Sequence, residues 1–305
     1  MKGENSTSVT KFILLDLSSN LQEQLTLFGV FTAIYLVALM GNMLILPLIS
    51  LDSRLHTLMY FLLGNFSVVD IGSTSSTMPK MLANYLSQDK SISWAFCLCQ
   101  MFFFISFRGI ECLLLGVMAY DRYVAICHHL HYGTFMSRRA CTLLAAAAWV
   151  MGLTNSTVHS SLISILSFCW GNVLRHFFCD ILPLFQLSCS NTWANQAITF
   201  ALSGAVILDS LLGTLVSYVY IVLAVLRIRT SEGHLKAFST CTSHLVMVSL
   251  YFGIVIFTYI HLNSTYPQHQ DRAQPMLYGI VTPMLNPIIY TEEEGGERGT
   301  PKSPG

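Results

Sequence analysis

The sequence predicts an all-α membrane protein, a bundle of seven transmembrane helices with the N-terminus outside and the C-terminus in the cytosol. Of the 305 residues, 53% are apolar and only 10% are charged, whereas a soluble domain carries about 25% charged residues. Apolar runs long enough to cross a bilayer recur seven times, and basic residues are distributed unevenly between them. The formal net charge is zero, so nothing in the composition indicates a nucleic-acid partner.

The apolar runs define the predicted elements and the domain plan. A helix needs about 20 mainly apolar residues to cross the hydrocarbon of a bilayer. The second run is diluted by the hydroxyl residues at 73–76 and the seventh by Gln274, Pro275 and Pro283. An extracellular N-terminus (1–24), a transmembrane domain (25–290) and a cytosolic tail (291–305) are expected. The predicted helices cover residues 25–49, 57–84, 97–120, 140–166, 196–226, 237–261 and 273–290.

The charges of the loops set the predicted orientation. The loops after the first, third and fifth helices hold an excess of Arg and Lys over carboxylates, whereas the opposite loops are balanced. Basic residues favour the cytosolic side of a membrane. The N-terminus is therefore expected outside the cell, where the sequon Asn5-Ser6-Thr7 is predicted to be glycosylated.

The cysteines fit this orientation. Four of the nine, Cys97, Cys169, Cys179 and Cys189, lie on the predicted outer side, where disulfides persist. Four cysteines allow three pairings, and Cys99 is a spare. The remaining ones are expected to be small buried thiols: Cys112, Cys127, Cys141 and Cys241.

Motifs along the chain resemble a known family. The segment MAYDRYVAIC at 118–127, Gly41-Asn42 in the first helix, LHTLMYFLLGNFSVVDI at the second, KAFSTCTSHL at the sixth and PMLNPIIY at the seventh resemble the olfactory receptors, which are rhodopsin-like G-protein-coupled receptors. The resemblance covers about residues 9–290. It implies a plasma-membrane receptor that binds a small volatile odorant, mostly hydrophobic, and activates a heterotrimeric olfactory-type stimulatory G protein in the cyclic AMP pathway.

Asp121-Arg122-Tyr123, at the cytosolic end of the third helix, is a candidate switch. An arginine held by its neighbouring carboxylate in one state can be released in another; the alternative is ordinary positive-inside anchoring. The resemblance implies that the released arginine and Tyr218 help to form the cavity for the G protein. The coupling residues that it implies are Asp121, Arg122, Tyr123, Tyr218, Lys236, Asn286, Pro287 and Tyr290.

Asp70 and Glu111 lie well inside the second and third helices. A carboxylate in hydrocarbon is costly unless it is partnered or neutralised. The resemblance places both near Asn42 and Asn286, where such receptors hold water or a cation. A protonated, hydrogen-bonded structural pair is the alternative interpretation.

Arg108 has two interpretations. It lies three residues before Glu111, so the two side chains can share a helix face and pair. Arg108 also lies one turn from Phe104, where the resemblance places the odorant pocket, and it could there favour an anionic or strongly accepting odorant such as a carboxylic acid. Asp209 in the fifth helix competes as a partner and would make the cavity neutral.

The rest of the pocket is implied by the resemblance alone. Small-ligand sites are generally apolar with few polar anchors, although each of these residues singly also fits ordinary core packing. The implied lining consists of Phe104, Ile105, Gly109, Leu202, Val206, Phe252, Val255, Tyr259 and Gly279.

The long outer loop carries the disulfides that the resemblance implies, Cys97 with Cys179 and Cys169 with Cys189. The segment HFFCD at 176–180 has the composition of a metal site, but the disulfide would consume Cys179, so no metal or cofactor is expected. No completed catalytic arrangement is found, which argues against an enzyme. No internal repeat is found either, which argues against a transporter.

The tail departs from the family pattern. After NPIIY the family has a short basic amphipathic helix on the inner leaflet. Here residues 291–297 read TEEEGGE and the rest is rich in Gly, Pro and Ser, a composition typical of disorder. The tail is expected to be a foreign or frame-altered ending, and a specialised acidic tail is the alternative. The alternative function is a receptor-shaped product with weak or no signalling.

Overall fold

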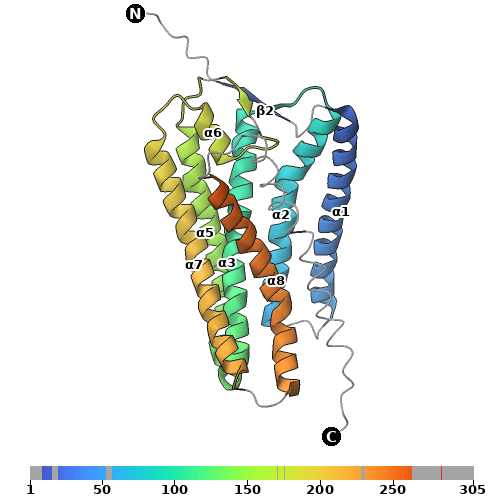
Figure 1. Ribbon diagram of the computed structural model, residues 1–305, viewed down its shortest axis with the longest axis vertical. Coiled ribbons are helices and arrows are strands. Elements are labelled where there is room, and N and C mark those ends of the chain that lie inside the picture. The colour runs from blue at the N-terminus through green and yellow to red at the C-terminus, as the bar shows by residue number, and fades with distance from the viewer. Residues whose placement is uncertain are drawn as a thin grey trace, which may run out of the picture.

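The structure is a computed structural model that describes residues 9–15, 20–52, 57–169, 171–174, 176–227, 231–262 and 283, with the side chains of 231–240 and 257–262 excepted. Long helices run side by side between the two ends of the molecule (Figure 1). They are α1 (Leu21–Leu51), α2 (Leu58–Leu86), α3 (Trp94–Cys127), α5 (Arg138–Ser164), α7 (Trp193–Val225) and α8 (Ser231–Leu262).

These helices coincide with the first six predicted transmembrane segments, and their ends differ from the predicted ones by a few residues. Polar residues cap several of them beyond the apolar run, as when the Ser93 side chain accepts a hydrogen bond from the Phe96 N–H at the start of α3 and Ser137 does the same for Ala140 at the start of α5. The predicted seventh segment, 273–290, lies outside the described residues except for Pro283.

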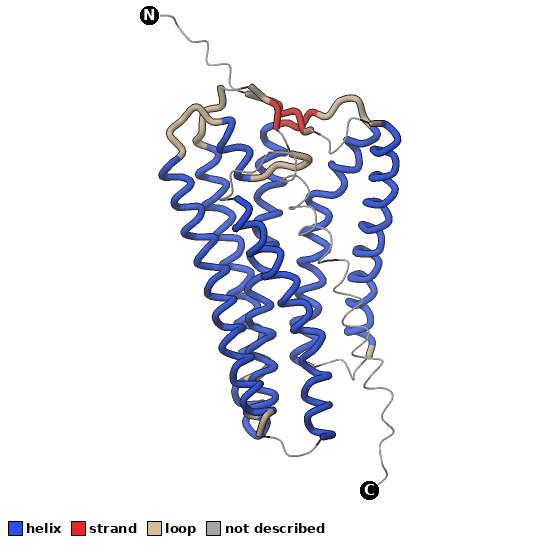
Figure 2. The backbone as a smooth tube through the Cα atoms, in the orientation of Figure 1, coloured by secondary structure: helices blue, strands red, loops and turns tan. Residues whose placement is uncertain are grey.

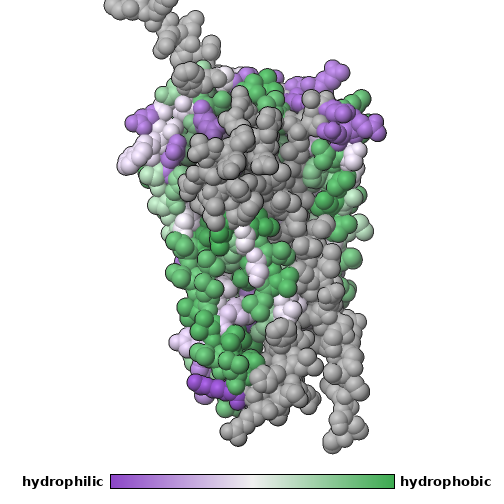
Figure 3. Space-filling model, in the orientation of Figure 1, coloured by the Kyte–Doolittle hydropathy of each residue, from purple (hydrophilic) through white to green (hydrophobic). Residues whose placement is uncertain are grey.

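Four of the described helices, α1, α3, α5 and α7, are long and apolar enough to cross a membrane, and α8 contains the shorter apolar stretch Cys241–Ile256. α2 is more polar in sequence, and several of its hydroxyl residues are buried: Ser67, Ser73 and Thr74 are at most 2% exposed. These three hydroxyl side chains therefore face the bundle, whereas Ser75 is exposed. Hydrophobic side chains cover the middle of the described surface in Figure 3, and hydrophilic ones gather at its two ends.

The bundle is built around α3, which packs against α2, α5 and α7, while α1 packs against α2. α3 and α5 approach closely at Gly109 and Gly152. A Cβ atom on Gly152 would lie 3.0 Å from the carbonyl oxygen of Ser106 and 3.1 Å from the Ile110 nitrogen. This crossing therefore requires glycine, because a side chain there would separate the two helices.

A small sheet that the sequence analysis does not predict covers the outer end (Figure 2). β1 (Lys11–Leu14) lies between β2 (Ser91–Ser93) and β3 (Val173–Leu174), antiparallel to β2 and parallel to β3. Phe12 and Leu14 of β1 are fully buried. The Phe12 ring packs edge-on against Trp94 and Phe168, so the N-terminal strand is anchored to the bundle by apolar contacts.

Short elements complete the described chain. η2 (His129–His131) and α4 (Tyr132–Phe135) lie between α3 and α5, and α6 (Ile181–Leu187) lies in the long outer loop. Two disulfides, Cys97–Cys179 and Cys169–Cys189, stabilise that loop, as the resemblance implied. Cys112, Cys141 and Cys241 are buried thiols, Cys127 is half-buried and Cys99 is exposed.

Candidate ligand-binding site

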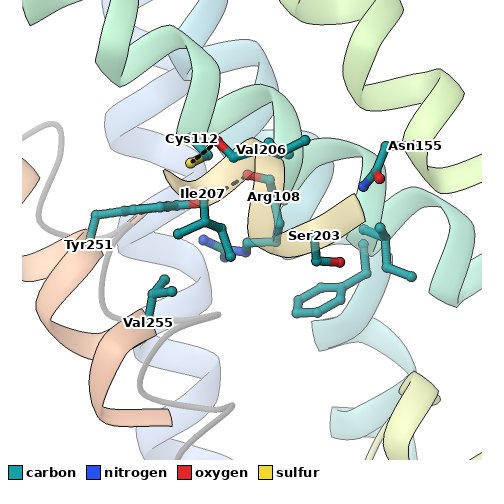
Figure 4. Close-up of a pocket in the computed structure, with 11 residues that line it drawn as sticks. Arg108, Cys112, Asn155, Ser203, Val206, Ile207, Tyr251 and Val255 are labelled. Carbon is teal, nitrogen blue, oxygen red and sulfur yellow. Dashed lines mark hydrogen bonds between the residues drawn. The ribbon is translucent and has the colours of Figure 1, made fainter. Parts of the chain in front are cut away.

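A cavity of about 190 Å³ lies between α3, α5, α7 and α8. Figure 4 shows side chains from these helices directed toward it. Most of the wall is apolar, which suits a small hydrophobic ligand. The lining residues are Phe104, Ile105, Arg108, Gly109, Cys112, Asn155, Ser203, Val206, Ile207, Tyr251 and Val255.

The cavity includes many of the residues singled out in the sequence. Phe104, Ile105, Arg108, Gly109, Val206 and Val255 line it. Leu202 is half-buried on α7 but is not part of the lining, and Phe252 is buried in the core of the bundle instead. The Tyr259 side chain and Gly279 lie outside the described residues.

Sequence reasoning missed several lining residues: Cys112, Asn155, Ser203, Ile207 and Tyr251. Helical spacing could have found some of them, because Ser203 lies three residues before Val206 and Tyr251 lies four residues before Val255. Tyr251 donates a hydrogen bond of 2.8 Å to the carbonyl oxygen of Arg108, which joins α8 to α3 (Figure 4).

Arg108 pairs with Glu111 and also borders the cavity. A guanidinium nitrogen lies 2.6 Å from Oε2 of Glu111, and the two side chains are 8% and 0% exposed. The guanidinium also lies 5.7 Å from the centre of the Phe104 ring and lines the cavity. Asp209 is exposed on α7 and borders a different groove. The positive charge at the cavity wall is therefore balanced by Glu111.

Polar groups at the side of the cavity are held by neighbouring helices. The Ser203 hydroxyl lies 3.0 Å from Nε2 of His159, which is fully buried on α5. The Ser210 hydroxyl donates to the carbonyl oxygen of Cys112, and the Cys112 thiol contacts the carbonyl oxygen of Val206. These bonds fix α7 against α3 and α5, and they place one hydroxyl, that of Ser203, at the wall.

The long outer loop covers the outer side of the site. The Phe178 ring packs on Phe104 with ring centres 4.9 Å apart, and the Cys179 N–H donates a hydrogen bond of 3.0 Å to the Gln100 side chain beside the Cys97–Cys179 disulfide. His176 is buried against Phe177. Among the described residues no group of three potential metal ligands comes together.

Buried polar side chains also lie on α1 and α2, whereas Glu111 of α3 pairs with Arg108. Asn42 and Asp70 are buried. The Asn42 amide donates hydrogen bonds of 3.0 Å to the carbonyl oxygens of Ala38 and Pro283, which ties α1 to the predicted seventh segment. Asn286 lies outside the described residues.

At the cytosolic end, Asp121 and Arg122 are buried. The Tyr132 hydroxyl of α4 donates a hydrogen bond of 2.7 Å to Asp121. Burial and this hydrogen bond raise the pKa of Tyr132, so the phenol remains a donor.

Two tyrosines of the predicted switch also have partners. The Tyr218 hydroxyl lies 2.7 Å from Nδ1 of the buried His244, which joins α7 to α8. The Tyr123 hydroxyl lies 3.0 Å from Nε2 of His128. The Lys236 side chain, Pro287 and Tyr290 lie outside the described residues, as does Asn5.

Together these features define a class. A helical membrane protein with a ligand cavity toward the outside and an Asp-Arg-Tyr motif, its Asp121 and Arg122 buried, toward the cytosol is a G-protein-coupled receptor. Comparison with known proteins supplies the family. Residues 31–294 match the model of the family described as olfactory receptor.

The relatives are similar over almost their whole length. The chain is 46% identical to human olfactory receptor 5F1, covering 95% of this chain and 93% of that one. It is 44% identical to mouse olfactory receptor 5AR1 (95% and 94%) and 45% identical to human olfactory receptor 2A25 (98% and 97%). The chain belongs to the olfactory receptor family. It is thus a seven-helix, multi-pass plasma-membrane receptor and not an enzyme.

Proposed function

We propose that the cavity lined by Phe104, Arg108, Val206 and Val255 binds a small volatile odorant. The volume of the cavity and the apolar character of its lining support this proposal most directly. About 190 Å³ is below the roughly 300–1,000 Å³ of ordinary ligand pockets, which favours a compact molecule. The lining is mainly aromatic and aliphatic, which favours a mostly hydrophobic one.

The ion pair of Arg108 and Glu111 at the cavity wall indicates which polar groups the odorant carries. An acid-binding pocket depended on an uncompensated Arg108, and Glu111 lies 2.6 Å from the guanidinium. A carboxylate ligand would have to compete with Glu111 for the guanidinium, whereas a ketone or ester can accept a hydrogen bond without disturbing the ion pair. Neutral acceptors are therefore expected to activate the receptor better than acids.

The test compares acids with their methyl esters on surface-verified receptor, measuring cyclic AMP. Esters are expected to be the stronger agonists of the wild type, and Glu111→Gln should shift the preference toward acids by about tenfold or more, because Arg108 then lacks its carboxylate partner. Acids that activate the wild type better than their esters would contradict the neutral-acceptor class. Arg108→Ala should weaken responses to both at equal surface expression.

The proposed signal is activation of an olfactory-type stimulatory G protein. Asp121, Arg122 and Tyr218 are buried at the cytosolic end, with Asp121 bonded to Tyr132 and Tyr218 to His244. These contacts fit a resting state whose rearrangement opens a cavity among α3, α7 and α8. Odorant-evoked cyclic AMP that appears only in cells supplying this G protein tests the pathway.

We also propose that the polar interior at Asn42, Asp70 and Glu111 holds water or a cation. Buried oxygens make no hydrogen bond with the described residues, namely Oδ1 of Asn42, Oγ of Ser67, Oγ of Ser73 and Oε1 of Glu111. Buried polar atoms of this kind are commonly satisfied by ordered water or an ion. Sodium-dependent thermal stability of the purified receptor, lost in Asp70→Asn, distinguishes a cation from water.

The tail supports a second candidate function, a receptor with weak coupling. Residues 291–297 carry four glutamates and no basic residue, and anionic lipid repels them. Replacing residues 291–305 with a basic amphipathic segment is expected to raise the cyclic AMP response. Equal signalling by the native tail at equal surface expression rules this candidate out.

A further inference from the structure

A groove on the lipid side of the bundle lies apart from the ligand cavity. It is bounded by α3, α5 and α7, has a volume of about 300 Å³, and shares no lining residue with the cavity. Its apolar wall includes Leu113, Val117, Leu144 and Met151. We call it the lipid-side groove.

Glycines shape this groove. A Cβ atom on Gly116 would lie 2.9 Å from the Ser210 hydroxyl, so α3 and α7 approach closely at its inner edge. A Cβ atom on Gly213 would meet no atom within 4 Å, so the groove is open beside α7. The groove is therefore hollow enough beside Gly213 to admit part of a small molecule.

One carboxyl group borders this hollow. Asp209 is exposed and is the central residue of α7 (Trp193–Val225). With a rise of 1.5 Å per residue it lies about 24 Å from either end of the helix, near the middle of a hydrocarbon layer about 30 Å thick. Its neighbours Leu208 and Leu212 are 57% and 58% exposed, which marks this face of α7 as lipid-facing.

Asp209 makes no hydrogen bond or ion pair with the described part of the chain. An ionisable group at this depth is costly in hydrocarbon and marks a functional site whose partner must be sought. The partner has to come from outside the described chain, has to donate hydrogen bonds or carry positive charge, and has to bring an apolar body that fits the groove.

Two other occupants fit less well. The ammonium group of a phospholipid lies in the headgroup layer, about 15 Å from the middle of the membrane, so it does not reach Asp209. A symmetric contact between two copies centred on α7 would bring the two Asp209 carboxyl groups together, but it supplies no basic group to pair with an ionised carboxylate.

We propose that the lipid-side groove is a second binding site, for a small lipophilic amine that enters from the bilayer and places its ammonium group on Asp209. Its hydrocarbon part lies between Leu113, Val117, Leu144 and Met151. Ser210 borders the groove and bonds to the carbonyl oxygen of Cys112, which lines the ligand cavity. An amine in the groove therefore acts on the helix pair that also forms the odorant site.

The test measures binding without signalling, so it stands or falls independently of the odorant proposal. Purified receptor in lipid nanodiscs is photolabelled with a tritiated diazirine-bearing alkylamine. Competition uses cyclohexylmethylamine and its neutral counterpart cyclohexylmethanol. The amine is expected to displace the label at concentrations at least about tenfold below those of the alcohol, and the labelled peptide should come from α3, α5 or α7.

Substitutions test the charge of Asp209 and the shape of the groove separately. Asp209→Asn removes the charge, and Gly213→Phe fills the groove while keeping Asp209; each is expected to weaken amine binding by about tenfold or more. Leu212→Phe adds the same ring at an exposed position of α7 outside the groove and should bind as the wild type does. Failure of the amine to label, equal competition by the alcohol, or unchanged binding in Asp209→Asn or Gly213→Phe overturns the proposal. Cross-linking of two copies through α7 that blocks labelling would also overturn it, in favour of a dimer contact.

Discussion

The buried ion pair of Arg108 and Glu111 gives a quantitative prediction for three variants, Arg108→Met, Glu111→Gln and the double variant. In the wild type the charged atoms lie 2.6 Å apart and Glu111 is fully buried. Removing the guanidinium leaves that carboxyl group without its partner. Breaking a buried pair costs roughly 3–5 kcal/mol of folding free energy, whereas replacing both partners by neutral groups is often nearly neutral.

The two single variants should lose different amounts of folding free energy. Glu111 is 0% exposed, whereas the Arg108 side chain is 8% exposed and borders the cavity. Exposure alone would favour the guanidinium, but an unpaired carboxyl group can take up a proton and become neutral, whereas an unpaired guanidinium stays charged. Glu111→Gln is therefore expected near the upper end of that range and Arg108→Met near the lower end. The double variant should recover most of the loss.

The assay is thermal unfolding of purified receptor in one detergent, combined as a double-mutant cycle. Arg138→Met is the matched control, because Arg138 is exposed at the start of α5, and its midpoint should stay within a degree or two of the wild type. Losses that simply add in the double variant would show that the pair is not energetically coupled, and the reasoning from burial would then be wrong.

Three further predictions address other parts of the molecule. Tyr132→Phe removes the hydrogen bond to Asp121, and basal cyclic AMP should rise up to about tenfold if that bond holds the resting state; unchanged basal activity at equal surface expression argues against this role. Gly152→Ala should lose most surface expression because the added methyl meets the α3 backbone, whereas Gly204→Ala, which has no atom within 4 Å of the new Cβ, should not; equal expression of the two would contradict the close crossing. Asn5→Gln should abolish the mobility shift caused by enzymatic deglycosylation, and a shift that persists would place the glycan elsewhere.

The long helices could be predicted because an apolar run indicates a membrane-crossing helix without knowledge of its neighbours. Their ends could not, since the caps depend on local polar side chains such as Ser93 and Ser137. α2 is the instructive case. Its hydroxyl residues weaken the hydropathy signal, and only the packed structure shows that Ser67, Ser73 and Thr74 face the bundle.

The site could be predicted where spacing along one helix was sufficient. Arg108 and Glu111 pair because residues three apart share a helix face. The lining from other helices was harder, because α7 is apolar on most sides and its sequence does not reveal which face meets the cavity. The exposure of Asp209 was missed for that reason, since a sequence alone does not distinguish a bundle-facing carboxyl group from a lipid-facing one. Ser203 could have been found only by extending the face of Val206, a residue that the resemblance supplied, by one helical turn.

The sheet on the outer end implies an order of events during synthesis. β1 leaves the ribosome early, yet its partner strands β2 (Ser91–Ser93) and β3 (Val173–Leu174) follow much later in the chain. Pairs so distant in sequence form late, because the intervening helices must be inserted first. Until α5 is in place, Phe12 and Leu14 remain available to chaperones of the secretory pathway. Closure of this sheet would then mark a receptor as ready for export, and a tag or deletion within residues 11–14 should cause retention even though it touches no transmembrane helix.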